Sequence, residues 1–339
     1  MSSDIADRIT SYINNLHPEQ HKDLYSVIEH ILSRSIPLWN LTLTPVLKER
    51  VEHPRVYYGQ LAPSSMLRIK YTEVVYDPSE RMPSRMMSDE TKEEYSRRYD
   101  QWVNEIRKLV LPDASVIVKL ANIHLTPENP SYDGGTWHVE GKLNERICAS
   151  AIYYYDCENI TPSRLAFRQH CETNGFKVWR TIDYPQWEYD WLPAVFGCEQ
   201  EGPGLQNIGT VDTLEGRLLT WPNVLQHQVQ PFKLANPSKP GHRKILALFL
   251  LDPNIRIIST ANVPCQQQHW WIEAIRQDRN KISTLPIEIQ DLIFGFLGEF
   301  PITMQHAKEE RVKLMDERKS FIVAQNARYL DSCFSLCEH

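Results

Sequence analysis

The sequence has no long apolar run, no block of like charge and no framework of evenly spaced cysteines. No stretch approaches the roughly 20 apolar residues that a membrane-spanning helix needs. The first residues, MSSDIADRIT, carry neither the basic nor the apolar part of a signal peptide. Seven scattered cysteines, an odd number, are typical of reduced thiols. These absences favour a cytoplasmic protein that has no membrane partner.

The charges are mixed along the chain, and their balance is mildly acidic. The 43 acidic residues exceed the 37 Lys and Arg, which gives a formal net charge of −6. Because the basic residues form no patch or arm, nucleic acid is not expected as a partner. The 339 residues, 42% of them hydrophobic, are enough for a substantial core. We find no internal repeat and no low-complexity segment in the sequence.

Helical patterns lie at both ends of the chain. In residues 4–35 apolar side chains recur at helical spacing, with a break at His17 and Pro18, and predict two packing helices. A charged helix is predicted over residues 89–111. After Pro264 the pattern is helical again, most clearly in PIEIQDLIFGFLGEF and AKEERVKLMDERKSFIVAQNARYL.

Strand patterns fill the middle of the chain. Five short β-rich runs are separated by Gly, Pro and Asn: ASVIVKLANIHL, RICASAIYYYD, RLAFRQH, GRLLTWPNVLQHQV and RKILALFLLD. We therefore predict an α+β protein with a barrel or sandwich of antiparallel strands at residues 112–262. A mainly helical region at 1–111 and helices at 263–339 would pack on it, in one compact unit. The aromatic stretch at 177–197 would form a cover loop, because loops of this length are usually functional lids.

The spacing His-x-Asp or His-x-Glu, which can supply two ligands to one metal ion, occurs four times. Two occurrences lie on the predicted N-terminal helices, where residues two apart point to different sides. In an extended segment the same spacing puts both side chains on one face. His138 and Glu140 follow a Gly pair and lead into a strand, whereas His170 and Glu172 lie at a turn and are the weaker candidates.

A third ligand is available in His227, at the end of a later β-rich run. Two histidines and one carboxylate on one face of an octahedron leave the other face open, an arrangement associated with non-haem Fe(II) oxygenases. The next β-rich run begins with Arg243, and an arginine beside such a site can hold a dicarboxylate by paired hydrogen bonds. Its neighbours His242 and Lys244 could share that role.

These residues carry a resemblance to known proteins. The β-rich region resembles the double-stranded β-helix, a cupin-like jelly roll, of the Fe(II)- and 2-oxoglutarate-dependent dioxygenases. Four segments resemble the largely fungal family called domain of unknown function 4246: IVKLANIHLTPENPSYDGGTWHVEGKLNERICASAIYYYD, GRLLTWPNVLQHQVQPF, RKILALFLLDP and ISTANVPCQQQHWW. The likeness extends from about residue 36 to the terminal SLCEH, and it is nearly silent as to substrate.

The resemblance implies Fe(II), 2-oxoglutarate and O₂ as cofactor and cosubstrates. His138, Glu140 and His227 would be the iron ligands, and Arg243 would anchor the distal carboxylate of 2-oxoglutarate. Glu140 stands where the superfamily more commonly has Asp. The implied activity is oxidation of a small-molecule substrate, such as a free amino acid or an intermediate of secondary metabolism. The outcome would be hydroxylation, desaturation or ring closure.

Two further groups of residues are candidates for the site. Asn122 and Tyr153 lie on neighbouring β-rich runs, from which their polar side chains could reach the cosubstrate. Aromatic residues of the cover loop could wall a substrate pocket: Trp179, Tyr184, Trp187 and Trp191. The alternative for these aromatic residues is ordinary packing between loop and barrel.

Two other functions stay open at this point. Protein-directed oxygenases of the histone-demethylase type also use His-x-Glu but typically hold 2-oxoglutarate with a lysine, for which Lys119 or Lys244 is available. The segment LPIEIQDLIFGFL, Leu285 to Leu297, resembles the start of an F-box and would recruit a ubiquitin-ligase adaptor beside an inactive barrel. An ordinary amphipathic helix accounts for the same pattern.

Overall fold

The computed structural model describes residues 8–43, 68–69, 94, 97, 115–170, 182–183, 187–253, 255, 257–278, 281–298, 300–331 and 333–336. The chain divides into two compact units, where the sequence predicted one. The first comprises Met1–Arg34 and Pro253–Phe321, and the second comprises Ser35–Asp252 and Ile322–His339. The first unit therefore joins an N-terminal and a C-terminal segment of the chain, and the strands belong to the second.

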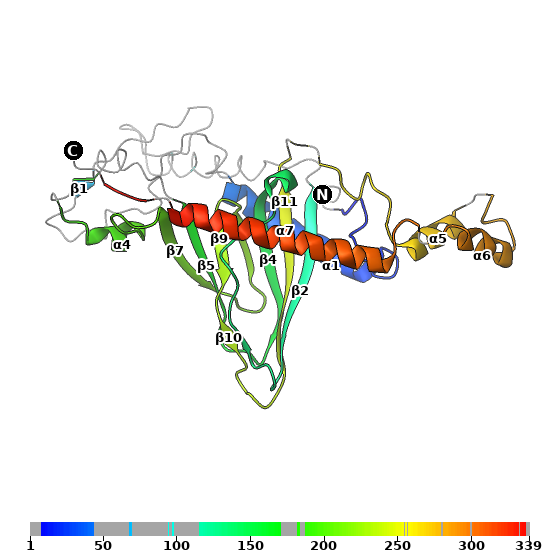
Figure 1. Ribbon diagram of the computed structural model, residues 1–339, viewed down its shortest axis with the longest axis horizontal. Coiled ribbons are helices and arrows are strands. Elements are labelled where there is room, and N and C mark those ends of the chain that lie inside the picture. Colours follow the sequence, from blue (N-terminus) through cyan, green and yellow to red (C-terminus); the bar gives the residue numbers. More distant parts are fainter. Residues whose placement is uncertain are drawn as a thin grey trace. The chain divides into compact units, whose positions relative to one another are not determined.

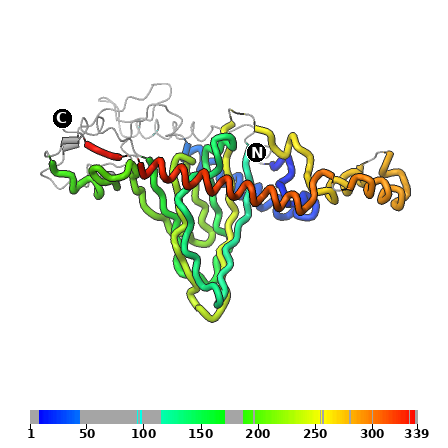
Figure 2. Tube along the Cα trace, in the orientation of Figure 1, coloured from blue at the N-terminus to red at the C-terminus, as the bar shows by residue number. Residues whose placement is uncertain are grey.

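The second unit is built on two antiparallel sheets (Figure 1). The larger has the order β2-β11-β4-β8, with β2 at Val116–Leu125, β11 at Gly241–Leu251, β4 at Ile147–Glu158 and β8 at Leu218–Pro222. The smaller has the order β7-β5-β9, with β7 at Leu205–Asp212, β5 at Arg164–His170 and β9 at Gln226–Val229. The long strands β2, β11 and β4 run side by side (Figure 2).

Shorter elements complete the second unit. Two-residue strands form two small ladders: β3 at Ser131–Tyr132 pairs with β10 at Phe232–Lys233, and β1 at Arg68–Ile69 pairs with β6 at Ile182–Asp183. The 3₁₀ helix η2 spans Leu143–Glu145, and the helix α4 spans Trp191–Phe196.

Alternation of side chains along the strands explains the core. In β11 the odd-numbered residues Arg243, Ile245, Ala247 and Phe249 share one face. Buried residues from both sheets meet on that side in one cluster: Ile152, Tyr154, Leu165, Trp221, Leu225, Ala247 and Phe249. Because apolar side chains of the two sheets are removed from water together, this cluster holds the sheets face to face.

The predicted α+β class with antiparallel strands is confirmed, with two differences in detail. The run GRLLTWPNVLQHQV forms two strands, β8 and β9, because a turn in which Leu225 N donates to Pro222 O (3.1 Å) separates them. The strand β7 was not predicted, since half of its sequence LQNIGTVD is polar and five of its eight residues are exposed.

The helices after Pro264 are confirmed as α5 (Gln268–Gln277), α6 (Ile287–Gly295) and α7 (Met304–Asp331). Of the two helices predicted near the N-terminus only the second is present, as α1 at Lys22–Leu43, because residues 8–21 form turns. Tyr25 stabilises those turns, since its hydroxyl accepts from Ile13 N (2.7 Å) and donates to Leu16 O (2.8 Å). The predicted helix at 89–111 lies outside the described residues, apart from two isolated positions.

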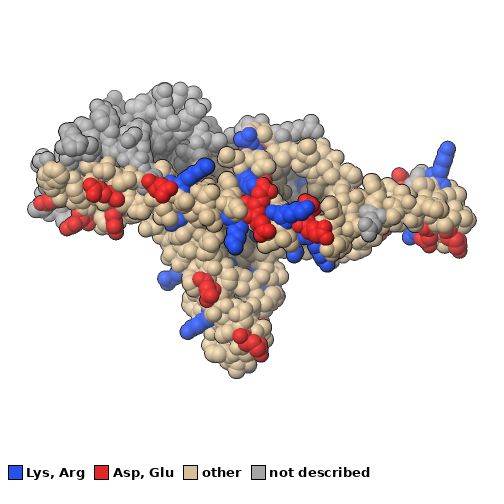
Figure 3. Space-filling model, in the orientation of Figure 1, with Lys and Arg blue, Asp and Glu red and all other residues tan. Residues whose placement is uncertain are grey.

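The surface of the described residues carries charges of both signs. On the face drawn in Figure 3, Lys and Arg side chains lie interspersed with Asp and Glu. None of the helices in the described ranges combines the length and the apolar character needed to cross a membrane. The F-box-like segment forms α6 and the turn after it, with Phe294 buried and Leu292 and Phe296 exposed.

Candidate metal centre

The loop before β4 lies against β9. Gly135 N donates to Val229 O (2.9 Å), and His138 and His227 exchange two backbone hydrogen bonds of 3.2 and 2.9 Å. The Gly pair permits this approach, because Gly134 has a φ of +96° and a Cβ there would lie 3.0 Å from Val229 O. The bridge sets the two imidazole rings side by side, with centroids 4.3 Å apart.

Glu140 completes the group. Its Oε1 lies 3.8 Å from His138 Nε2 and 3.3 Å from His227 Nε2. One ligand atom from each of the three side chains lies within 4.8 Å of the others, and no other group of this kind occurs among the described His, Cys, Asp and Glu residues. The side chains are 3% exposed for His227, 18% for Glu140 and 26% for His138, so the group opens on the side of His138.

Hydrogen bonds orient the ligands. His138 Nδ1 donates to the carbonyl of Thr136 at 2.7 Å, which leaves Nε2 free as a metal ligand. Asn223 holds the backbone of Glu140 from both sides, since its Oδ1 accepts from Glu140 N (2.9 Å) and its Nδ2 donates to Glu140 O (2.8 Å). The same Nδ2 donates to Ile147 O at 3.0 Å, so Asn223 also fixes the start of β4.

The electrostatics of the three ligands suit a cation. Burial disfavours the charged form of Glu140, but hydrogen bonds and charge from the two imidazoles outweigh it and hold the pKa well below its ordinary value. Burial also opposes protonation of His138, yet Glu140 and the Thr136 carbonyl raise the pKa of His138. Burial, together with the charge of His138, lowers the pKa of His227. A carboxylate between two imidazoles is a donor set that fits Fe(II) and related divalent metals.

Arg243 lies on the inner face of β11 and is 3% exposed. Its Nε and Nη1 are buried and have no hydrogen-bond partner in the described part of the chain. Its Cζ lies 5.1 Å from the ring centroid of Phe232 and 5.6 Å from that of Tyr154. Burial lowers the pKa of Arg243, although a guanidinium in a protein stays protonated. A buried cation with unpaired donors favours an anionic ligand.

Tyr154, and not Tyr153, stands beside this guanidinium. The pairing of β11 with β4 shifts register between Lys244 and Ile245, so that Ile245 faces Tyr154 and Leu246 faces Tyr153. Tyr154 therefore points inward, is 1% exposed and has a hydroxyl without a partner among the described residues. Burial raises the pKa of Tyr154 to about 12, so the hydroxyl keeps its proton and can donate it in a hydrogen bond.

Asn122 also lies away from Arg243. It pairs with Lys244 in the ladder between β2 and β11, on the face of the sheet opposite to Arg243. Its Oδ1 accepts a hydrogen bond from Tyr155 OH at 3.3 Å. The structure therefore brings neither Asn122 nor Tyr153 to the guanidinium.

The sequence neighbours of Arg243, His242 and Lys244, point away from it. Lys244 Nζ and His242 Nε2 lie 2.6 and 2.9 Å from the two carboxylate oxygens of Asp156, on that opposite face. Lys119 is different, because it lies opposite Ala247 and so shares the inner face with Arg243. Its positive charge opposes protonation of His138.

The cover-loop residues divide into two groups. Trp179 and Tyr184 lie outside the described residues. Trp187 is 72% exposed. Trp191 packs on a small cluster of Leu192, Cys198, Phe334 and Leu336, and its Nε1 donates to Glu188 O at 2.7 Å. For Trp191 the contacts are thus those of ordinary packing.

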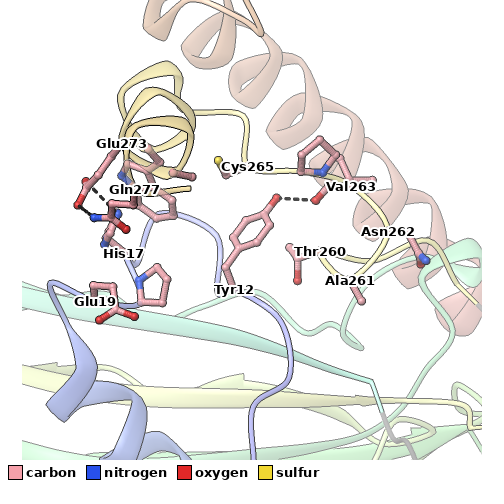
Figure 4. Close-up of a pocket in the computed structure, with 14 residues that line it drawn as sticks. Tyr12, His17, Glu19, Thr260, Ala261, Asn262, Val263, Cys265, Glu273 and Gln277 are labelled. Atoms are coloured by element: carbon pink, nitrogen blue, oxygen red, sulfur yellow. Dashed lines mark hydrogen bonds and ion pairs between the residues drawn. The ribbon is translucent and has the colours of Figure 1, made fainter. Parts of the chain in front are cut away.

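A separate hollow lies in the first unit (Figure 4). It has a volume of about 510 Å³ and is lined by residues from two segments, which lie between Tyr12 and Glu19 and between Thr260 and Gln277. His17 Nε2 lies 3.3 Å from Glu273 Oε2, and its ring meets Trp270 edge-on at 4.8 Å. Tyr12 OH donates to Val263 O at 3.0 Å. His17 thus pairs with Glu273, and Tyr12 pairs with a backbone carbonyl. Among the described residues, the side chains that line this hollow form no group that could hold a metal ion.

Comparison with known proteins gives one family match. The family model described as "Protein of unknown function (DUF4246)" matches residues 1–274. No curated protein matches the sequence.

Several solved structures are similar to the chain at low identity. One is a bsmA homolog from Methylobium petroleophilum PM1, with 12% identity over 40% of each chain and a TM-score of 0.24. Another is the Fe(II)/(alpha)ketoglutarate-dependent dioxygenase TqaL, with 14% identity over 58% of this chain and 63% of that one and a TM-score of 0.27. A third is AviO1 from Streptomyces viridochromogenes Tue57, with 12% identity over 58% and 78% and a TM-score of 0.23. The chain spans less than two thirds of the length of the first two.

Metal binding tests the group directly. The purified chain should hold one Fe(II), or one Co(II) as a stable probe, and His138→Ala or His227→Ala should reduce the metal of dialysed protein to background. His124→Ala, which removes a histidine outside the group, should leave the metal content unchanged. Elemental analysis gives the stoichiometry. Full metal content in both ligand variants would contradict the assignment.

The pH dependence of this binding has a defined sign. The metal needs a neutral imidazole at His138. Because the pKa of His138 is raised, protons begin to compete with the metal for this imidazole at a pH above the ordinary pKa of about 6.5. Co(II) affinity should therefore be highest at the upper end of the range from about pH 5 to 8 and should fall steadily as pH falls. Titrations at several pH values measure it, and an affinity independent of pH would show that His138 is not a ligand.

Proposed function

The chain belongs to the DUF4246 family of proteins of unknown function, and we propose that it is an Fe(II)- and 2-oxoglutarate-dependent dioxygenase. One observation carries the proposal: a compact His-Glu-His group and a buried guanidinium with unpaired donors lie within the same two-sheet unit. A metal with open coordination positions and an anchored dicarboxylate are the two requirements of this chemistry. We further propose that the two packed sheets are the halves of a double-stranded β-helix.

The roles of the residues follow from their positions. His138, Glu140 and His227 would hold the iron. Bound iron and 2-oxoglutarate would supply the chemistry, which is oxidation of a substrate C–H bond by O₂ coupled to conversion of 2-oxoglutarate to succinate and carbon dioxide. Arg243 would donate to the distal carboxylate through Nε and Nη1, and the protonated hydroxyl of Tyr154 would add a further donor.

The surroundings of Arg243 are suited to a buried anion. Phe232 and Tyr154 flank the guanidinium with aromatic rings and exclude water from it. In such surroundings a charge-assisted hydrogen bond is stronger than in water. The same surroundings make an unpaired guanidinium costly, so a dicarboxylate that reaches it would be bound firmly.

We propose a small-molecule substrate, such as a free amino acid or a secondary-metabolite intermediate. Two of the three ligands are largely covered by protein, and the most exposed, His138, still shows only 26% of its side chain. Small molecules reach such a site more readily than a folded partner does. The interspersed charges on the drawn face favour no polyanionic partner (Figure 3).

Arg243 gives the test of the cosubstrate. Arg243→Ala should weaken 2-oxoglutarate binding by about 3 to 5 kcal/mol while leaving metal content intact, because the carboxylate loses its charged partner. Arg243→Lys should recover only part, since an ammonium lacks the planar fork. Lys244→Ala is the matched control, because that side chain points to the opposite face. Calorimetric titration of the Co(II)-loaded protein without O₂ measures all four proteins.

The corresponding activity assay uses the Fe(II) protein. Small amines, amino acids and organic acids are screened for release of succinate above the rate without substrate, with His227→Ala as the inactive reference. If Arg243→Ala binds 2-oxoglutarate with wild-type affinity, Arg243 is not the residue that anchors the cosubstrate. Succinate release unchanged in His227→Ala would contradict the proposed function.

A further inference from the structure

Each metal-ligand histidine has a sequence neighbour on the outer face of the smaller sheet. Adjacent residues of an extended segment point to opposite faces, so Trp137 lies behind His138 and Gln226 lies behind His227. Arg168 of β5 pairs with Gln226 in the ladder and contacts both neighbours. Its Nε donates to Gln226 Oε1 at 2.8 Å, and its Cζ lies 4.5 Å from the ring centroid of Trp137.

The last turns of α7 reach this outer face (Figure 1). Asn326 Oδ1 accepts from Gln226 Nε2 at 2.9 Å and from Arg168 Nη2 at 3.2 Å, and Asn326 Nδ2 donates to Trp137 O at 2.8 Å. One turn later, the ring of Tyr329 lies 5.4 Å from that of His170 on β5. A single side-chain amide thus joins the residues behind both histidines.

The segment that carries Asn326 is also attached at its other end. Phe334 accepts from Glu201 N and donates to Gly202 O, both at 2.8 Å, and Leu336 N donates to Gln200 Oε1 at 2.8 Å. Phe334 and Leu336 are 3% and 2% exposed in the cluster with Leu192. Residues 322–336 belong to the second unit but lie beyond residues 1–274, which the family model matches.

We propose that this C-terminal segment is part of the metal centre, and that Asn326 is a positioning residue that fixes the spacing between the two metal-ligand histidines. The inference rests on the proposed function. Its physical basis is that the bridge between His138 and His227 is isolated, and the one further backbone hydrogen bond between the two segments is that of Gly135 N to Val229 O. A contact behind both segments limits how far the two imidazoles can separate, and metal affinity depends on such support.

The charges and hydrogen bonds behind the histidines make the contact costly to lose. Arg168 is partly buried, and burial lowers its pKa, so its donors need acceptors within the protein. Removing the Asn326 amide takes one acceptor from Arg168, one acceptor from Gln226 and the donor from the Trp137 carbonyl. The two ligand segments would then lose their common attachment to α7.

Five full-length proteins test the proposal: wild type, Asn326→Ala, Asn326→Asp, Arg328→Ala and His227→Ala. Co(II) is titrated into each, the visible spectrum of the bound metal is recorded, and melting of the metal-free proteins is measured alongside. Asn326→Ala should weaken Co(II) binding about tenfold or more. Its melting temperature should fall, because the higher helix propensity of alanine offsets only part of the three lost hydrogen bonds.

The other variants separate positioning from folding. Asn326→Asp keeps the acceptors for Arg168 and Gln226 but loses the donor to Trp137, so it should bind Co(II) weakly and with an altered spectrum. Arg328→Ala changes an exposed side chain on the same helix and should match wild type. His227→Ala removes a proposed ligand and should not bind the metal.

Each outcome decides the proposal. Wild-type affinity and spectrum in both Asn326 variants would overturn it and leave the metal centre intact. If Asn326→Ala melts at a much lower temperature, the Co(II) affinity of Asn326→Asp becomes the test. Wild-type affinity in Asn326→Asp would then overturn the proposal. A wild-type chain that binds no Co(II), or binding unchanged in His227→Ala, would contradict the proposed function, and the positioning role would fall with it.

Discussion

The backbone bridge between His138 and His227 is the interaction on which the rest of the site depends. Two hydrogen bonds join a loop to the short strand β9 and bring the imidazole rings to 4.3 Å. The left-handed Gly134 allows the chains to approach, and Asn223 holds Glu140 in place beside them. The two sheets, packed through one apolar core, supply the fixed frame in which a bridge of only two bonds keeps its geometry.

A second constraint is the charge buried in that core. A guanidinium with unpaired donors lowers the free energy of unfolding unless a partner arrives, and replacing such a group with an apolar side chain often stabilises a protein. Arg243 is therefore costly as a purely structural residue. Arg243 lies on the inner face of β11, flanked by Tyr154 and Phe232. An anion bound there would pair with the guanidinium and offset this cost. The same reasoning explains why a tyrosine hydroxyl is left without a partner beside it.

The three ligand candidates could be predicted from the sequence, because alternation in an extended segment is a local rule and the strand patterns were clear. The choice between Tyr153 and Tyr154 could not, because the register shift next to Lys244 exchanges the two faces of β4 and leaves no local pattern. Asn326 could not be found either. A helical pattern shows which side of a helix is polar but does not show which sheet it packs on, and the contact spans 189 positions of sequence.

The central claim is that one chain holds a metal and a dicarboxylate together. The most direct measurement is the visible difference spectrum on adding 2-oxoglutarate to the Fe(II)-loaded protein without O₂. The account predicts a weak charge-transfer band that saturates at one equivalent, is absent in His227→Ala and needs a large excess of 2-oxoglutarate in Arg243→Ala. Fe(II)-loaded wild-type protein that gives no band at any concentration of 2-oxoglutarate would contradict it.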